Sequence, residues 1–287
     1  MSIRTDLACE VLQSLDTPIP GVEYTSRRRD GFGVESVAIN TSSASEAIGK
    51  PQGHYITLEL GGLMRREDDA FYRASHALAE ELSPLLPNTE GIVLVTGLGN
   101  RNITPDSIGP EVVRWTMATR HLRDADEMFH ALRPVAALAA GVLGDTGMES
   151  AELIAAVCRT LHPECVIAVD ALASRDIERL CRTVQLSDTG IVPGSGVGNR
   201  RAGINSALTG CPVIAVGVPT VVDARTLAAD VTGTDEASIP PESARGLIVT
   251  PREIDRDAAD ISRLVGYALN LALQPTLDIA DLDMLLG

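Results

Sequence analysis

An apolar, β-branched segment that runs into a glycine-rich loop constrains the fold of this chain more than any other feature. Residues 91–96 (GIVLVT) have the composition of a buried parallel strand. Residues 97–110 follow at once and lead into a helix that we predict over residues 107–119. This order places the carboxyl group of Asp106 at the carboxyl end of a strand, where open α/β sheets carry their chemistry.

A second predicted strand, residues 165–169, also ends in a carboxylate, that of Asp170. Two acids at the same edge of one sheet suggest a hydrolytic pair. One ionised carboxylate takes a proton from water, and one protonated carboxyl donates a proton. Two carboxyls a few ångströms apart can divide these roles because their repulsion raises the pKa of one of them.

Both acids also have a structural alternative. Asp106 follows Thr104 and Pro105, an order typical of a helix N-cap and first turn, and Asp170 could cap the helix after its own strand. The dipole of the helix after Thr104 favours the ionised form of Asp106, so Asp106 is the expected base of a catalytic pair.

Strand-like and helix-like segments alternate along most of the chain. The predicted strands are 34–39, 55–60, 91–96, 165–169, 212–218 and 247–249, and the predicted helices are 70–86, 107–119, 149–161, 174–182, 220–230 and 256–273. Such alternation predicts a three-layer α/β sandwich with a mainly parallel or mixed sheet covered on both faces. The polar residues 231–243 are expected to form a surface loop.

Charge and cysteine content exclude several classes of function. The formal net charge is −15, so the chain is a poor candidate for binding nucleic acid or an anionic membrane surface. The sequence has no signal-like apolar core and no run near 18 apolar residues, which favours a cytoplasmic protein. Its five cysteines form no CxxC pair and are expected to be buried, reduced thiols.

Long motifs in a fixed order add a family resemblance over nearly the whole chain. They are residues 3–8 (IRTDLA), 97–110 (GLGNRNITPDSIGP), 119–122 (TRHL), 133–135 (RPV), 144–147 (GDTG), 165–175 (CVIAVDALASR), 187–199 (SDTGIVPGSGVGN), 217–224 (GVPTVVDA) and 249–255 (VTPREID). With these motifs the chain resembles the germination protease (spore protease) family. It is a short form, because it lacks the family's long insertion between the helix after Asp223 and residues 249–251.

The resemblance implies a function and a setting. It implies an endopeptidase that starts the degradation of small acid-soluble spore proteins during germination, with Asp106 and Asp170 as catalytic residues. It further implies a homotetramer in the cytoplasm of the forespore or spore core, and a fold similar to that of hydrogenase-maturation peptidases. We expect no cofactor and no metal, since two acids are too few ligands to define a metal site.

The resemblance also implies a self-processing zymogen. Family substrates are cut after an acidic residue and before an apolar one, and residues 5–10 (TDLACE) reproduce that pattern. Cleavage between Asp6 and Leu7 would release residues 1–6 as a propeptide and leave residues 7–287 as a single α/β peptidase domain. The alternative is a chance match in which the acids cap a first helix.

Six further residues are expected to bind substrate or support the pair: Asn100, Asp188, Gly194, Ser195, Gly196 and Arg175. Asp188 has an alternative as a turn former before Gly190. The segment 194–198 matches neither G-x-S-x-G nor G-x-G-x-x-G, and is interpreted as a tight loop that lets the backbone approach substrate. Two other functions stay open: a metal-dependent maturation-type peptidase, and an inactive homologue that binds spore proteins.

Overall fold

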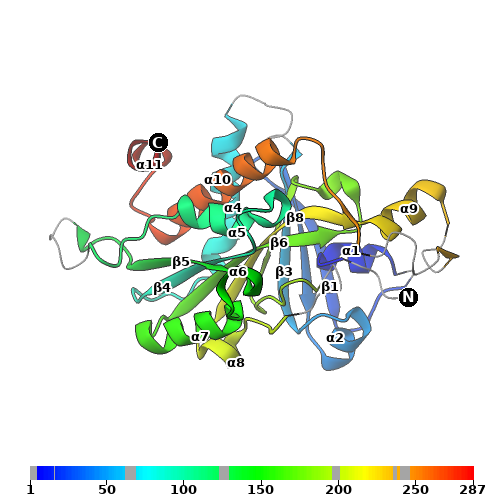
Figure 1. Ribbon diagram of the computed structural model, residues 1–287, viewed down its shortest axis with the longest axis horizontal. Coiled ribbons are helices and arrows are strands. Elements are labelled where there is room, and N and C mark those ends of the chain that lie inside the picture. The colour runs from blue at the N-terminus through cyan, green and yellow to red at the C-terminus, as the bar shows by residue number, and fades with distance from the viewer. Residues whose placement is uncertain are drawn as a thin grey trace.

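A mixed β-sheet runs through the centre of the molecule, with helices on both of its faces (Figure 1). The computed structural model describes residues 5–15, 17–61, 69–122, 129–195, 201–234, 238–239 and 246–287. The strands are β1 (Val22–Arg29), β2 (Phe32–Ile39), β3 (Gly53–Glu59), β4 (Val93–Leu98), β5 (Val135–Gly141), β6 (Cys165–Ser174), β7 (Thr183–Ser187), β8 (Val213–Asp223) and β9 (Ile248–Val249).

The helices vary from a single turn to 20 residues. They are α1 (Ala8–Gln13), α2 (Ser42–Ile48), α4 (Ala70–Leu82), α5 (Ile108–Arg114), α6 (Leu143–Thr146), α7 (Ser150–Leu161), α8 (Ser206–Thr209), α9 (Ala224–Thr232), α10 (Ile254–Leu273) and α11 (Ile279–Leu286). Short 3₁₀ turns occur at Ser83–Leu85, Thr104–Asp106 and Ile177–Arg179.

The sheet has a parallel half and an antiparallel half. Its strand order is β1-β2-β3-β7-β8-β6-β4-β5, and β9 pairs with β8. Strands β5, β4, β6 and β8 are mutually parallel, whereas β1, β2, β3 and β7 pair antiparallel, as does β7 with β8. The carboxyl ends of β4 and β6 therefore meet at one edge.

Apolar side chains on the two faces of the sheet pack against different helices. One face packs against α4, α5 and α10 in the largest hydrophobic cluster, which contains the buried Val95 and Ile167. The other face packs against α7 and α8 through residues such as Leu94 and Val166. A third cluster joins α1 and α2 to the antiparallel half. The predicted three-layer sandwich is confirmed.

Three predicted helices differ from the structure. The helix predicted over 174–182 is wrong, because β6 stays extended to Ser174 in its ladder with β8 and only a 3₁₀ turn follows. The helix predicted over 220–230 begins at Ala224, because β8 continues to Asp223, whose side chain caps the helix by accepting from the N–H of Arg225 at 2.9 Å.

The helix predicted over 107–119 ends at Arg114 because a side chain from another helix takes its terminal backbone groups. Asn270 of α10 accepts from the N–H of Met117 at 2.9 Å and donates to the carbonyl of Trp115 at 2.7 Å. Strands β1, β5 and β7 were not predicted. Part of the loop predicted over 231–243 lies outside the described residues, and its first residues finish α9.

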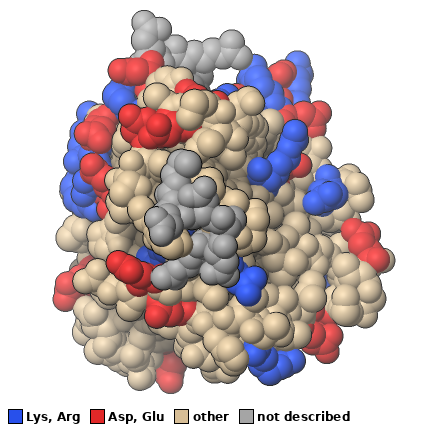
Figure 2. Space-filling view, turned by 90° about the vertical axis from the view of Figure 1, so that its left-hand side faces the viewer, with Lys and Arg blue, Asp and Glu red and all other residues tan. Residues whose placement is uncertain are grey.

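The structure also shows the state of the cysteines and the distribution of charge on the surface. All five cysteines are free, four of them buried, and burial raises the pKa of the Cys165 thiol to about 12. Among the described residues, no helix is both long and apolar enough to cross a membrane. Acidic and basic side chains are interspersed on the face shown in Figure 2.

Candidate active site

Asp106 is presented by the loop that joins β4 to α5. It ends the 3₁₀ turn Thr104–Asp106 and is half-buried, and its Oδ2 accepts from the backbone N–H of Asn100 at 2.8 Å. Thr220 of β8 anchors the same turn by donating to the carbonyl of Pro105 at 2.6 Å. Ser107, not Thr104, is the N-cap residue of α5, so Asp106 precedes the helix instead of lying in its first turn.

Two glycines allow this loop to fold tightly. Gly99 has φ +102°, and a Cβ there would collide with the backbone oxygen of Asp106 and approach its Oδ1 to 2.9 Å. A Cβ on Gly97 would collide with the backbone of Gly109 at the start of α5. The glycine-rich sequence is therefore needed so that the loop can turn beneath the Asp106 carboxyl group.

Asp170 lies within β6 and is 5% exposed. Its Oδ1 accepts from the backbone N–H of Ala171 at 2.9 Å. The ladder between β4 and β6 ends at the pair Gly97 and Val169, whereas β6 continues to Ser174. Asp170 therefore lies where β6 leaves its neighbour β4, and the loop after β4 brings Asp106 to the same place.

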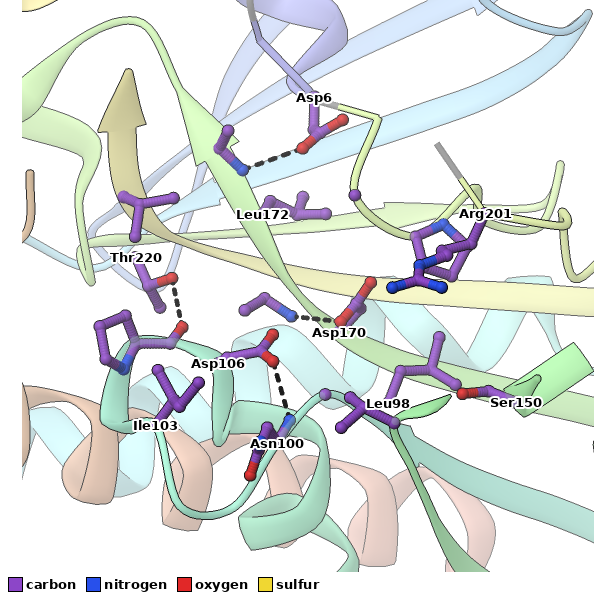
Figure 3. Close-up of a pocket in the computed structure, with 18 of the residues that line it drawn as sticks. Asp6, Leu98, Asn100, Ile103, Asp106, Ser150, Asp170, Leu172, Arg201 and Thr220 are labelled. Carbon is purple, nitrogen blue, oxygen red and sulfur yellow. Dashed lines mark hydrogen bonds between the residues drawn. The ribbon is translucent and has the colours of Figure 1, made fainter. Parts of the chain in front are cut away.

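Both carboxyl groups line one cavity of about 360 Å³. Figure 3 shows Asp106 and Asp170 extending toward one another from their two elements. The polar and charged residues that line the cavity also include Asp6, Asn100, Glu149, Ser150, Arg201 and Thr220, and apolar lining comes from residues such as Leu98, Ile103, Leu143, Leu172 and Ile248. This is a mostly apolar cleft with a few convergent polar groups, as binding sites commonly are.

The surroundings make both carboxyl groups harder to ionise. Burial raises the pKa of Asp106, and the Asn100 N–H opposes this. The pKa of Asp170 is raised well above its ordinary range, first by burial, then by the negative charge of Asp106 and then by that of Asp6. The two acids are thus held with unequal proton affinities, the arrangement that separates an acid from a base.

Asp6 reaches this cavity from the N-terminal segment (Figure 3). Its backbone N–H donates to the carbonyl of Ala173 at 2.9 Å, so the segment lies beside the part of β6 that extends beyond β4. Its carboxylate accepts from the N–H of Ala173 at 2.9 Å and from Ser195 Oγ at 2.5 Å. Leu7, the next residue, is fully buried in the cluster around α1.

The other residues singled out in the sequence are divided between this cavity and other places. Asn100 and Gly194 line the cavity, and Ser195 contacts Asp6. Arg175 pairs with Asp230 at 3.2 Å, while its N–H donates to Glu10. Gly196 lies outside the described residues.

Asp188 lines a second cavity, of about 480 Å³, beside β2 and β3. Its Oδ1 accepts from the backbone N–H of His54, and its Oδ2 contacts His54 Nδ1, both at 2.7 Å. These contacts tie β3 to the end of β7.

Sequence reasoning missed Arg201 and Thr220 as parts of the site. Arg201 lies on the Asp170 side of the cavity in Figure 3, and its Nη1 donates to Glu149 at 3.1 Å. Thr220 stands within the quoted segment 217–224, which gave a local signal, whereas nothing in the sequence marked Arg201. Within the described ranges, no three or more His, Cys, Asp or Glu side chains form a group that could hold a metal ion.

Comparison with known proteins places this site in a family. A family model described as "Germination protease" matches residues 6–234. Germination proteases from Clostridium tetani and Caldanaerobacter subterraneus subsp. tengcongensis are 38% and 40% identical, with all of this chain and 100% and 98% of those chains covered. One from Bacillus cereus is 43% identical over 80% of this chain and 65% of its own. These matches define the chain as a peptidase. It belongs to the germination protease family, which confirms the resemblance found in the sequence.

Comparison with solved structures gives a match of lower sequence identity. The [NiFe] hydrogenase maturation protease HycI from Thermococcus kodakarensis is 18% identical with a TM-score of 0.38, covering 66% of this chain and 99% of that chain.

Proposed function

We propose that this chain is an endopeptidase that degrades small acid-soluble spore proteins during germination, with Asp106 and Asp170 as its catalytic pair. The observation that carries the proposal is the shared cavity of the two carboxyl groups, in a chain that matches germination proteases along its full length. Raised pKa values in a cleft are typical of acid–base groups.

The unequal surroundings of the two acids support an assignment of their roles. Asp106 has the less perturbed pKa and is the base. It takes a proton from a water molecule as the oxygen of that water attacks the peptide carbonyl carbon. Asp170 is buried beside two negative charges and is the acid that gives its proton to the leaving amine as the C–N bond breaks. Proton transfer by one positioned side chain contributes about 10²–10⁴ in rate.

We further propose that the chain processes itself between Asp6 and Leu7, with residues 1–6 as the propeptide. Asp6 already lies in the cavity with both catalytic acids, which supports the proposal. Cleavage in this conformation requires movement, because Leu7 is buried and the Asp6 carbonyl accepts from Lys50 Nζ at 2.9 Å and Gln185 Nε2 at 3.1 Å. Until it leaves, Asp6 blocks part of the cleft.

A homotetramer in the spore core completes the proposal. The apolar sequence of residues 60–64 (LGGLM) makes this segment a candidate for subunit contacts. Leu60 is fully buried within its own chain, and residues 62–64 lie outside the described range. Light scattering at micromolar concentration tests the tetramer, and a monomer mass contradicts it.

The function is tested with a purified small acid-soluble spore protein. We expect the wild-type chain to cut it after acidic residues, and Asp106→Asn and Asp170→Asn to lose at least about 100-fold in rate while circular dichroism shows an intact fold. Cleavage sites and the N-terminus of the enzyme are read by mass spectrometry. Binding without turnover by the wild-type chain would contradict the proposal and favour a binding homologue, and turnover by both variants would remove the catalytic assignment.

A further inference from the structure

Every polar atom of Asp6 is held by a group from elsewhere in the fold. Its N–H donates to the carbonyl of Ala173, and its own carbonyl accepts from Lys50 Nζ and Gln185 Nε2. Its two carboxylate oxygens accept from Ser195 Oγ and the Ala173 N–H. We call these four partners, Ala173, Ser195, Lys50 and Gln185, the Asp6 cradle.

The cradle is built for an extended peptide with an acidic side chain. Ala173 lies on the part of β6 that extends beyond β4, and its main-chain N–H and C=O groups both bond to Asp6. A strand edge that its neighbouring strand leaves unpaired accepts a peptide through main-chain hydrogen bonds, while side-chain pockets supply the specificity. Here the pocket beside the strand edge presents two donors to two carboxylate oxygens.

An amide side chain satisfies these donors less well than a carboxylate. If its NH₂ group faced the Ala173 N–H, two donors would oppose each other. If it faced Ser195, the hydroxyl would have to accept and would lose its bond to a charged oxygen, which is the stronger type. Ser195 therefore decides how strongly charge is preferred at this position.

We propose that the carboxylate-binding end of the Asp6 cradle, Ser195 Oγ and the Ala173 N–H, is the subsite that recognises the acidic residue preceding the scissile bond in substrates, with Ser195 as a specificity-determining residue. Lys50 and Gln185 hold the Asp6 carbonyl and release it before cleavage. The ligand class is an extended peptide carrying Asp or Glu. The proposal rests on the proposed function, because it treats Asp6 as a stand-in for the substrate's acidic residue. The cavity it shares with Asp106 and Asp170 places such a residue beside the catalytic pair.

The experiment frees the two carboxylate donors of the cradle in the full-length chain with Asp6→Ala, so that an acidic peptide competes only with the main chain of residue 6. Two peptides are compared, one with the sequence of residues 3–10 (IRTDLACE) and one with Asn in place of its Asp. We expect kcat/KM to favour the Asp peptide by about tenfold, because a hydrogen bond to a charged group is lost with Asn. Adding Ser195→Ala should bring that ratio close to one, mainly through KM.

A matched serine serves as the control. Ser150 lines the same cavity, but its Oγ donates to the carbonyl of Gly141 at 2.9 Å and not to Asp6. Ser150→Ala in the same background should leave the Asp-to-Asn ratio unchanged. The same comparison is repeated with Asp6→Asn, which leaves an amide in place of the Asp6 carboxylate. Circular dichroism confirms the fold of each variant.

Binding is measured separately so that the subsite and the function can fail independently. Fluorescence anisotropy with labelled peptides uses the Asp6→Ala, Asp170→Asn double variant, which we expect not to turn over. A preference for the Asp peptide that disappears with Ser195→Ala supports the subsite, even if no variant cleaves a peptide. Efficient cleavage with a preference that survives Ser195→Ala overturns the subsite and leaves the proposed function standing. Equal binding of both peptides overturns it as well.

Discussion

The negative charge of Asp106 reaches Asp170 across the cavity and raises its pKa, in addition to the larger effect of burial. The two residues come from segments 64 positions apart in sequence, and parallel pairing of β4 with β6 brings them together. The raised pKa of Asp170 affects both the pH dependence of the unfolding free energy and the proton transfer expected in catalysis, so both can be used to test the pair.

Replacing Asp170 with Asn should change how stability depends on pH. A folded-state pKa raised above the unfolded value means that the unfolded chain releases the proton first, so stability is lost as pH rises from about 4 toward the folded pKa. Asn cannot ionise and removes this loss. We expect Asp170→Asn to match the wild type near pH 4 and to be more stable at pH 8 by about 1 kcal/mol or more.

Urea unfolding at several pH values measures this difference. Asp188→Asn is a control acid outside the pair. The expectation fails if the wild type and Asp170→Asn keep the same difference in unfolding free energy from pH 4 to pH 8.

The glycine beneath Asp106 offers a test of how the loop positions that acid. Gly99→Ala forces a side chain into positive φ and against the Asp106 backbone. We expect it to cost about 2 kcal/mol or more in unfolding free energy and to reduce turnover. Gly49, with φ +73° and open space around its Cα, is the control: Gly49→Ala should cost about 1 kcal/mol from strain alone. Full activity in Gly99→Ala would contradict the claim that glycine at this position is needed to place the Asp106 carboxyl group.

The anchor of the N-terminal helix is a buried carboxylate, that of Glu10. It accepts from Ser174 Oγ at 2.6 Å and from the N–H groups of Arg175 and Asp176 at 2.8 and 3.0 Å, and it also contacts the Thr5 hydroxyl. Gln at this position would place an NH₂ group against backbone donors. Glu10→Gln should therefore destabilise the chain by about 1–3 kcal/mol.

The exposed pair of Glu178 and Arg182 supplies the comparison for Glu10. Glu178→Gln should change the unfolding free energy by less than about 0.5 kcal/mol, because exposed ion pairs contribute little. Chemical denaturation measures both variants, and equal effects would contradict the anchoring role of Glu10.

Strands β4, β6 and β8 of the parallel half could be predicted because they are continuous apolar runs that end in recognisable loops, whereas the alanine-rich β5 could not. Asp106 and Asp170 were found for the same reason, since each follows such a run. Strand β7 was missed because its five residues are held by pairing with β3 and β8, which local sequence does not report. The end of α5 likewise depends on Asn270, more than 150 residues away.

The contacts of Asp6 show a similar limit. The motif around Asp6 marked it as substrate-like, but its partners come from the strand edge at Ala173 and from three separate segments. Only the folded chain brings Lys50, Gln185 and Ser195 to one residue. Arg201 was not predicted as part of the site for the same reason, because only the folded chain brings it to the cavity.

The most direct test of the central claim is the titration of Asp170 in the presence and absence of its partner. Carboxyl ¹³C chemical shifts of labelled Asp residues are followed by NMR from pH 3 to pH 9, in the wild type and in Asp106→Asn, with Asp170→Asn used to assign the signal. If the two acids form a coupled pair, removing the Asp106 charge lowers the pH at which Asp170 titrates. An Asp170 titration midpoint that is the same in both proteins would contradict the pair.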